Sequence, residues 1–540
     1  MGVWLLDCYR SRVKKEWKIA FVSAFLFGFL VHMYLFTNSL LNHDALYNFY
    51  SSQNMVGSGR WFLSIACGFS SFFNLPWLIG VLSVFFIALT AVVIVNIFTV
   101  ENPVLIIIIS GLLTTFPAIT ETFFFEFTAD GYMIAMLLAA LAVRFSMIGA
   151  KRKGNIVALI CICLSCGIYQ AYVSFALVLA ISYFIIEVLE NRHSLKTYVC
   201  WIRNQCIVYL GGMALYYTVW KICMYVQHYK ATTYLGMDHL GQMNIHNIVG
   251  AVYQTIQSFV LFFVEYNFIE HGLTVYAILN LLFLALAAIV TVIAILKSKL
   301  YQRKVEFVLC IASACAIPFF VFIWYFVSYG VSYGTRMEQS ICICYILVSL
   351  LAERWLTPKW SSVAGVLLAA IVFNSSITAN VFYYYMNKCN QQTYAAAIEM
   401  STRIHEMDDG TITSVLIVGA LDTWEDKDYV DSSVLGTLGP LKLINKTLLR
   451  NQNYVALYLK NILDFELSYY IENPDVEMPS RTQVGTEPVP DGWTLEFPLL
   501  SIEDAEAILE TDEYESMSCW PASDSVKAIG ETIVVKLSEP

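Results

Sequence analysis

The chain has 540 residues, of which 58% are hydrophobic and 14% charged, and its formal net charge at pH 7 is -10. A soluble globular domain carries about 25% charged residues. A composition as apolar as this one therefore excludes a purely soluble protein. The acidic balance also argues against a nucleic-acid partner, because phosphates repel a negative surface.

The charge is divided unevenly along the chain. Residues 1–381 hold 22 Lys/Arg and 15 Asp/Glu, a net charge of +7, whereas residues 382–540 hold 10 and 27, a net charge of -17. We therefore predict an all-α polytopic membrane body over residues 1–385 and an acidic, soluble, extracytoplasmic α/β domain over residues 386–540.

Apolar runs long enough to form helices through a bilayer core of about 30 Å recur along the first part. Five basic residues at positions 10–18 flank the start of the first run, and the run lacks a small-residue cleavage site, which predicts an uncleaved anchor with a cytoplasmic N-terminus. Eleven spans are predicted: Trp17–Phe36, Trp77–Phe98, Pro103–Ala118, Gly131–Met147, Asn155–Ile168, Tyr172–Leu189, Cys206–Val226, Leu273–Leu296, Phe307–Phe326, Ser340–Leu351 and Val363–Tyr383.

The basic residues between the spans agree with this order. With the N-terminus inside, 17 Lys/Arg fall in cytoplasmic pieces, and only Arg60, Lys230 and Arg336 fall in the outer loops before the C-terminal part. This is the bias that the positive-inside rule requires. Eleven spans then place the C-terminal domain outside a bacterial cytoplasmic membrane.

Two of the outer loops, residues 38–76 and 228–271, are long and half apolar. Within them, Trp61–Phe73 and Ile248–Val264 are predicted to form helices in the plane of the interface. Long interfacial loops on one face only indicate that binding or chemistry takes place on that face.

The C-terminal part has the pattern of a mixed α/β domain. Tyr394–Met407 has helical spacing, and Thr413–Leu421 and Thr532–Leu537 are typical of buried strands. The part contains no Gly-rich phosphate loop, zinc signature or nucleophile elbow. Its two cysteines, Cys389 and Cys519, could form a disulfide outside the cytoplasm.

Acidic residues near the outer ends of the spans are the first candidates for chemistry. His43 and Asp44 follow the first span, and Asp130 begins the fourth in ETFFFEFTADGY, after Glu121 and Glu126. A carboxylate in such a place could act as a general base toward the exterior. Asp44 and Asp130 could instead simply cap helices.

Other polar groups gather at the same face. Arg60 lies in GSGRWF, Tyr169 and Gln170 lie in GIYQAY, and Arg336 lies in GTRMEQS. An outer arginine runs against the charge bias, and its planar fork suits phosphate. Arg336 could instead pair with Glu338, and GIYQAY could be an ordinary hydrogen-bonded turn.

In this order, NHDALYNFY, GSGRWF, FTADGYMIAMLLAALAV, GIYQAY and GTRMEQS resemble a bacterial membrane glucosyltransferase family. It is the family of the O-antigen glucosyltransferases of serotype conversion and their Gram-positive relatives, and the likeness runs over residues 1–380 or so. The resemblance implies a GT-C type glycosyltransferase. Such an enzyme takes a hexose, here glucose, from a polyprenyl-phosphate carrier and attaches it to a cell-envelope glycan acceptor outside the cytoplasmic membrane.

The resemblance also implies catalytic roles for two acids. In GT-C enzymes an acid of the first outer loop is the base that activates the acceptor hydroxyl, and Asp44 fits that position. A second acid in the next outer loop assists, and Asp130 matches it. No metal or other cofactor is implied, because the donor is a monophosphate and the outer loops before the C-terminal part hold no DxD motif.

Substrate-binding roles follow in the same way. Arg336 and Arg60 would hold the lipid phosphate, where a fixed cation stabilises the negative charge that grows as the glycosidic bond breaks. His43, Tyr169 and Gln170 would bind substrate beside them. Inversion at the anomeric carbon is an expectation of the family.

Three other functions stay open. A transporter or flippase of lipid-linked sugars would show internal repeats, which this chain lacks, and polar groups at mid-membrane. A polysaccharide polymerase or ligase would share the spans and the outer arginine but would use a diphosphate-linked oligosaccharide. A receptor or scaffold would only display the C-terminal domain.

Overall fold

The computed structural model describes residues 13–230, 245–268, 274–328, 331, 333–408, 410–412, 414–421, 440–441, 447–450, 452–464, 469–470 and 502–539. The chain divides into two compact units. The first unit comprises Met1–Thr37, Ser52–Val381 and Ser432–Leu441, and the second comprises Asn38–Ser51, Phe382–Asp431 and Lys442–Pro540.

The first unit is built of helices, as predicted. In chain order they are α2 (Lys15–Thr37), α4 (Leu63–Phe72), α5 (Pro76–Ile97), α6 (Pro103–Thr115), α7 (Pro117–Phe124), α8 (Ala129–Phe145), α9 (Arg152–Ile168), α10 (Tyr172–Leu189), α11 (Leu195–Val226), α12 (Ile245–Phe268), α13 (Val275–Lys297), α14 (Lys304–Val321), α15 (Ile341–Trp355) and the first part of α16 (Pro358–Met407). Short 3₁₀ turns are η1 (Glu126–Thr128), η3 (Leu300–Gln302), η4 (Ile323–Phe326) and η5 (Thr335–Met337). Each of the eleven predicted spans overlaps a helix, but Pro103–Ala118 crosses from α6 into α7 and Phe307–Phe326 runs past the end of α14 into η4.

Many of these helices are apolar along their whole length. Within the described part of the chain, ten segments are long and apolar enough to cross a membrane, and two of them join neighbouring elements, α6 with α7 and η1 with α8. α12 is one of the ten, although the sequence predicted a helix in the interface plane at this place. α9 and α15, with 17 and 15 residues, are shorter than the ten. The short α4 confirms a helix within Trp61–Phe73.

Proline separates two helices that hydropathy alone would join. α6 ends at Thr115, Phe116 is extended, and α7 begins with Pro117. Proline has no N–H to continue the preceding helix and fits the first position of a new one. The break gives the first unit a separate short helix, α7, which packs against η5.

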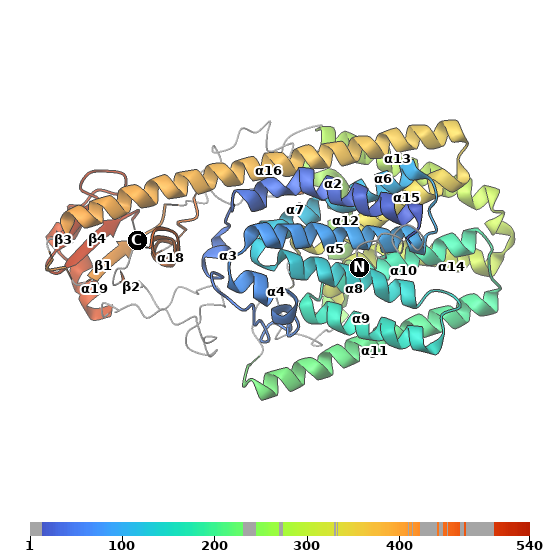
Figure 1. Cartoon of the computed structure of the whole chain (residues 1–540), viewed down its shortest axis with the longest axis horizontal. Helices are drawn as coiled ribbons and strands as arrows, with labels where there is room; N and C mark the ends of the chain where they lie inside the picture. The colour runs from blue at the N-terminus through green and yellow to red at the C-terminus, as the bar shows by residue number, and fades with distance from the viewer. Residues whose placement is uncertain are drawn as a thin grey trace, which may run out of the picture. The chain divides into compact units, whose positions relative to one another are not determined.

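The helices of the first unit pack in a regular succession (Figure 1). α2 packs on α5 and α6, α5 on α8, α8 on α9, and α9 on α11. Small residues allow the close approach: a Cβ added at Gly80 would lie 2.5 Å from the Phe36 ring, and one at Gly212 would lie 2.8 Å from Ile162. In an apolar solvent such close packing, rather than the hydrophobic effect, holds helices together.

The second unit contains a four-stranded sheet. Its strands are β1 (Ser414–Val418), β2 (Tyr469–Tyr470), β3 (Val526–Ile529) and β4 (Thr532–Lys536), in the order β2-β1-β4-β3. β1 is parallel to β2 and β4, and β3 and β4 are antiparallel. Both predicted strands are confirmed, and so is the predicted helix, because α16 runs to Met407.

Residues of β1 point alternately into two apolar clusters. Val415 and Ile417 belong to the first, which we call the α18-side core; it also includes residues of α16 and of α18 (Gln452–Leu463). Leu416 and Val418 belong to the second, the α19-side core, with residues of α19 (Ile502–Leu509) and α20 (Asp512–Glu515). β1 is therefore buried on both faces, as parallel strands are.

The two cysteines of the C-terminal part are not joined by a disulfide. Cys389 lies buried in the α18-side core. Cys519 is partly exposed, and its thiol lies 3.5 Å from a carboxylate oxygen of Glu539.

Candidate functional site

Arg60 ends a tight turn in the first unit. The turn is closed by an isolated bridge between Met55 and Arg60, and Gly59 takes a positive φ of 81° that favours glycine. Arg60 is only 5% exposed, and its guanidinium carbon lies 4.9 Å from the centre of the Tyr169 ring. The aromatic face therefore orients the cation.

Three side chains from other elements hold this turn. From α11, the Tyr216 hydroxyl donates to the carbonyl of Gly59 (3.1 Å), and the indole N–H of Trp220 donates to another carbonyl of the same turn (2.8 Å). Gln170 donates to the carbonyl of Ser58 (2.8 Å) and to the Tyr216 hydroxyl (2.9 Å). Gln170 thus ties the arginine turn to α11, a positioning role that the sequence alone did not indicate.

The motifs GSGRWF and GIYQAY are direct neighbours. The backbone N–H of Phe62 donates to the carbonyl of Gly167 (2.8 Å), and a Cβ added at Gly167 would lie 2.8 Å from the Trp61 ring. Beyond this contact, the Tyr169 ring stacks on Tyr132 of α8, with centroids 4.5 Å apart. The structure therefore brings Arg60, Tyr169 and Gln170 together.

Arg336 lies in η5, and α7 fixes its place. Its backbone N–H donates to Oε2 of Glu121 (2.8 Å), and its guanidinium carbon lies 3.9 Å from the centre of the Phe125 ring. The carboxylate that holds this segment is thus Glu121, a residue to which the sequence analysis assigned no role. Glu338, the partner suggested by proximity in sequence, is itself buried.

Buried polar contacts connect the segments of the two arginines. The side-chain amide of Gln339 donates to Oγ1 of Thr122 (2.9 Å) and to the hydroxyl of Tyr172 (3.0 Å). Tyr172 is fully buried, and its ring centre lies 6.1 Å from that of Tyr169. Gln339 and Tyr172 stand inside the quoted motifs GTRMEQS and GIYQAY, so motif membership was the signal that could have identified them.

Tyr333 precedes η5 and is held neutral. Burial raises the pKa of its phenol well above the ordinary value, and the neighbouring Tyr325 and Glu338 act in the same direction. Its oxygen accepts a hydrogen bond from the backbone N–H of Trp324 (2.8 Å), which opposes this rise only in part. A group so far from ionising at neutral pH is unsuited to act as a base.

Asp130 is packed into the first unit and is 1% exposed. Its Oδ2 accepts from the hydroxyl of Ser70 in α4 (2.6 Å), and its Oδ1 accepts from the N–H of Gly131 (2.9 Å). The carboxylate therefore joins α4 to the first turn of α8.

His43 and Asp44 belong to the second unit, where they lie in α3 (His43–Leu46). The N-cap of α3 is Asn42, whose Oδ1 accepts from the N–H of Ala45 (2.7 Å), so Asp44 is not the capping residue. Nε2 of His43 lies 3.4 Å from Oδ1 of Asp44, and the Asp44 side chain is 25% exposed. Asp44 thus combines partial exposure with an adjacent imidazole.

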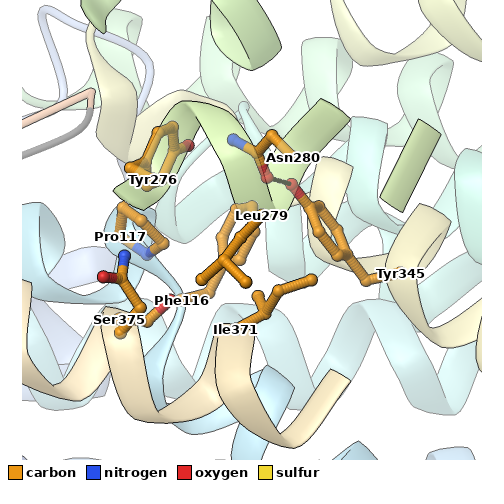
Figure 2. A pocket seen from close by; sticks show the side chains of 9 residues that line it. Phe116, Pro117, Tyr276, Leu279, Asn280, Tyr345, Ile371 and Ser375 are labelled. Carbon is orange, nitrogen blue, oxygen red and sulfur yellow. Dashed lines mark hydrogen bonds between the residues drawn. The ribbon is translucent and has the colours of Figure 1, made fainter. Parts of the chain in front are cut away.

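A small pocket lies elsewhere in the first unit, between the α6–α7 break, α13, α15 and α16 (Figure 2). The cavity volume is only about 10 Å³, which is roughly the space that one water molecule needs. Its polar centre is Asn280, whose Oδ1 accepts from the Tyr345 hydroxyl (2.7 Å). None of the predicted site residues lines it. In the part of the chain that the structure describes, no group of three His, Cys, Asp or Glu side chains could hold a metal ion.

Comparison with known families supports the interpretation of these motifs. The family model of the glucosyl transferase GtrII matches residues 33–336, more than half of the chain. The matched stretch holds every predicted site residue, from His43 to Arg336. No curated protein and no solved structure matches the chain. With its motifs in this order and the family model matched over this length, the chain belongs to the GtrII glucosyl transferase family.

Proposed function

We propose that this glucosyl transferase is a GT-C type membrane enzyme that moves glucose from a polyprenyl-phosphate carrier to a cell-envelope glycan outside the bacterial cytoplasmic membrane. In this proposal the chain is a multi-pass protein with its N-terminus inside and its C-terminal domain outside. The observation that carries the proposal is the pair of arginines, Arg60 and Arg336, each oriented by an aromatic ring.

Oriented guanidinium groups suit a phosphate-linked donor. A guanidinium offers a planar fork of donors to phosphate oxygens and keeps its charge at every physiological pH. The rings and hydrogen bonds around Arg60 and Arg336 fix these cations before the substrate arrives. A fixed cation near the carrier phosphate stabilises the transition state, because the leaving phosphate gains charge as the bond to the sugar breaks.

Asp44 would supply the general base. Its carboxylate takes the proton of the acceptor hydroxyl while the hydroxyl oxygen forms a bond to the anomeric carbon. The bond from that carbon to the phosphate oxygen breaks, and its electron pair leaves with the carrier phosphate. A single displacement of this kind inverts the anomeric centre. His43, 3.4 Å from the carboxylate, would orient it and contact the substrate.

The proposal is tested with the purified protein in liposomes and with polyprenyl-phosphate glucose, mannose and galactose as donors. We expect the glucose donor to be consumed and free polyprenyl phosphate to appear when a cell-envelope glycan is present. A flippase would move the lipid between leaflets without consuming it. Consumption of a diphosphate-linked oligosaccharide instead would identify a polymerase.

The proposed second acid, Asp130, can be tested against its structural role. Ser70→Ala removes the hydroxyl that bonds Oδ2 of Asp130, and it should lower the free energy of unfolding by about 1.5–3 kcal/mol without lowering transfer per folded molecule. Asp130→Asn should lower transfer per folded molecule as well. Thermal unfolding and transfer are measured on both variants. If both variants lose stability but keep the normal transfer per folded molecule, Asp130 is a structural residue only.

A further inference from the structure

The core of the second unit is completed by a segment from the first outer loop. Asn38–Ser51 lies between two stretches of the first unit in the sequence, yet it belongs to the second unit. Within it, Leu46 is 1% exposed and Tyr47 is 8% exposed, and both are members of the α18-side core. This core therefore has its full set of apolar side chains only when the loop is in place.

Tyr454 of α18 makes the central contact with α3. Its ring centre lies 4.9 Å from that of Tyr47 and 5.8 Å from that of His43, and both pairs are edge-on. Edge-to-face ring pairs have a preferred geometry and contribute beyond the area they bury. His43 in turn contacts the carboxylate of Asp44, so Tyr454 contacts the residue that lies against the proposed base.

Two asparagines fix the backbone on either side of this contact. Asn390 of α16 makes a two-way contact with Leu41: its Oδ1 accepts from the Leu41 N–H (3.2 Å), and its Nδ2 donates to the Leu41 carbonyl (2.9 Å). Asn461 of α18 donates to the carbonyl of Leu46 (3.1 Å). The loop is thus held before and after His43 and Asp44.

The loop could not keep this shape unaided. α3 has only four residues, and an isolated helix of one turn is unstable because its nucleation is unfavourable. The contacts with α16 and α18 therefore help to hold His43 and Asp44 in place. All of α16 and all of α18 lie beyond the stretch that matches the family model, which ends at residue 336.

A segment of the C-terminal part belongs, conversely, to the first unit. Pro440 comes from the C-terminal part of the chain but belongs to the first unit, where its carbonyl accepts from the Thr335 hydroxyl (2.9 Å). Thr335 directly precedes Arg336 in η5. The C-terminal part thus contacts the segments that carry both the proposed base and one of the proposed phosphate ligands.

We infer that the C-terminal domain is a positioning module of the transferase: its α16 and α18 hold residues 38–51 in place and thereby set the Asp44 carboxylate for the acceptor. This inference rests on the proposed role of Asp44. Tyr454, Asn390 and Asn461 act through Asp44 and are positioning residues. The contacts of α16 and α18 with residues 38–51 then govern acceptor activation and leave donor binding unchanged.

The test measures hydrogen exchange and transfer on the full-length protein. Tyr454→Ala should speed amide exchange in Asn38–Ser51 and lower kcat about tenfold to a hundredfold, with an unchanged KM for polyprenyl-phosphate glucose. Tyr454→Phe keeps the ring, so its amide exchange in Asn38–Ser51 and its kcat should both be close to those of the unchanged protein. The matched control is Tyr514→Ala, which removes an equally buried tyrosine from the α19-side core and should alter neither. Asn461→Ala, which deletes a single hydrogen bond, replaces Tyr454→Ala if that variant does not fold.

The outcomes separate this inference from the proposed function. Unchanged exchange in Asn38–Ser51 would show that α18 does not hold the loop. Faster exchange with unchanged kcat would show that the held loop does not position the base. Full activity of Asp44→Asn would instead overturn the base assignment, whatever the exchange experiment shows.

Discussion

Asp44→Asn should reduce sugar transfer by about 10²–10⁴-fold while the protein still folds and inserts. The substitution keeps the size of the side chain and removes its ability to accept a proton at neutral pH. Asn42 caps α3 and does not depend on Asp44, so the helix should survive. Transfer from polyprenyl-phosphate glucose is measured at saturating donor and acceptor, beside thermal unfolding.

Two further variants make this result specific. Asp44→Glu keeps a carboxylate but displaces it, and it should retain a measurable part of the activity. Asp512→Asn makes the same chemical change at an exposed acid of the second unit and should transfer at the normal rate. Transfer by Asp44→Asn near the normal rate would remove Asp44 from the mechanism.

Arg336→Ala should impair the use of the lipid donor more than the use of the acceptor. Loss of a fixed charge at a leaving phosphate lowers turnover by about 10²–10³-fold. The contact with Glu121 comes from the backbone N–H of Arg336, so the alanine variant keeps this anchor of η5. Kinetics are measured by varying donor and acceptor separately.

Lysine at the same position distinguishes charge from shape. Arg336→Lys keeps a point charge but loses the planar fork and its stacking on Phe125, so we expect partial recovery only. Arg144→Ala, at an exposed arginine near the end of α8, is the matched control. An equal loss in the use of donor and acceptor would argue against phosphate binding by Arg336.

Local patterns in the sequence predicted most of the helices and two of the strands. Apolar runs located the spans because hydropathy is a property of neighbouring residues. The strands β1 and β4 were predicted for the same reason, since TSVLIVGAL and TIVVKL are continuous apolar runs. The break between α6 and α7 at Pro117 was missed, because the residues on both sides of it are apolar and form one continuous hydrophobic run.

Candidate site residues could be named from the sequence, but their contacts could not be predicted from it. Gln170 was named as a candidate polar group, but only the structure shows that it donates a hydrogen bond to the carbonyl of Ser58, 112 residues away. Glu121 was left without a role because its partner is a backbone N–H 215 residues further along the chain. At the start of α3 the sequence suggested Asp44 as a cap, but the helix begins at His43 and Asn42 caps it.

The membership of Asn38–Ser51 in the second unit has a consequence for biosynthesis. Leu41 and its partner Asn390 are separated by 349 residues, so the loop is made long before the side chains that hold it. At about 5–20 residues per second this delay lasts roughly 17–70 s. During this time Leu46 and Tyr47 lack their apolar surroundings. We therefore expect the newly made loop to be open to chaperones or proteases until α16 and α18 have been synthesised.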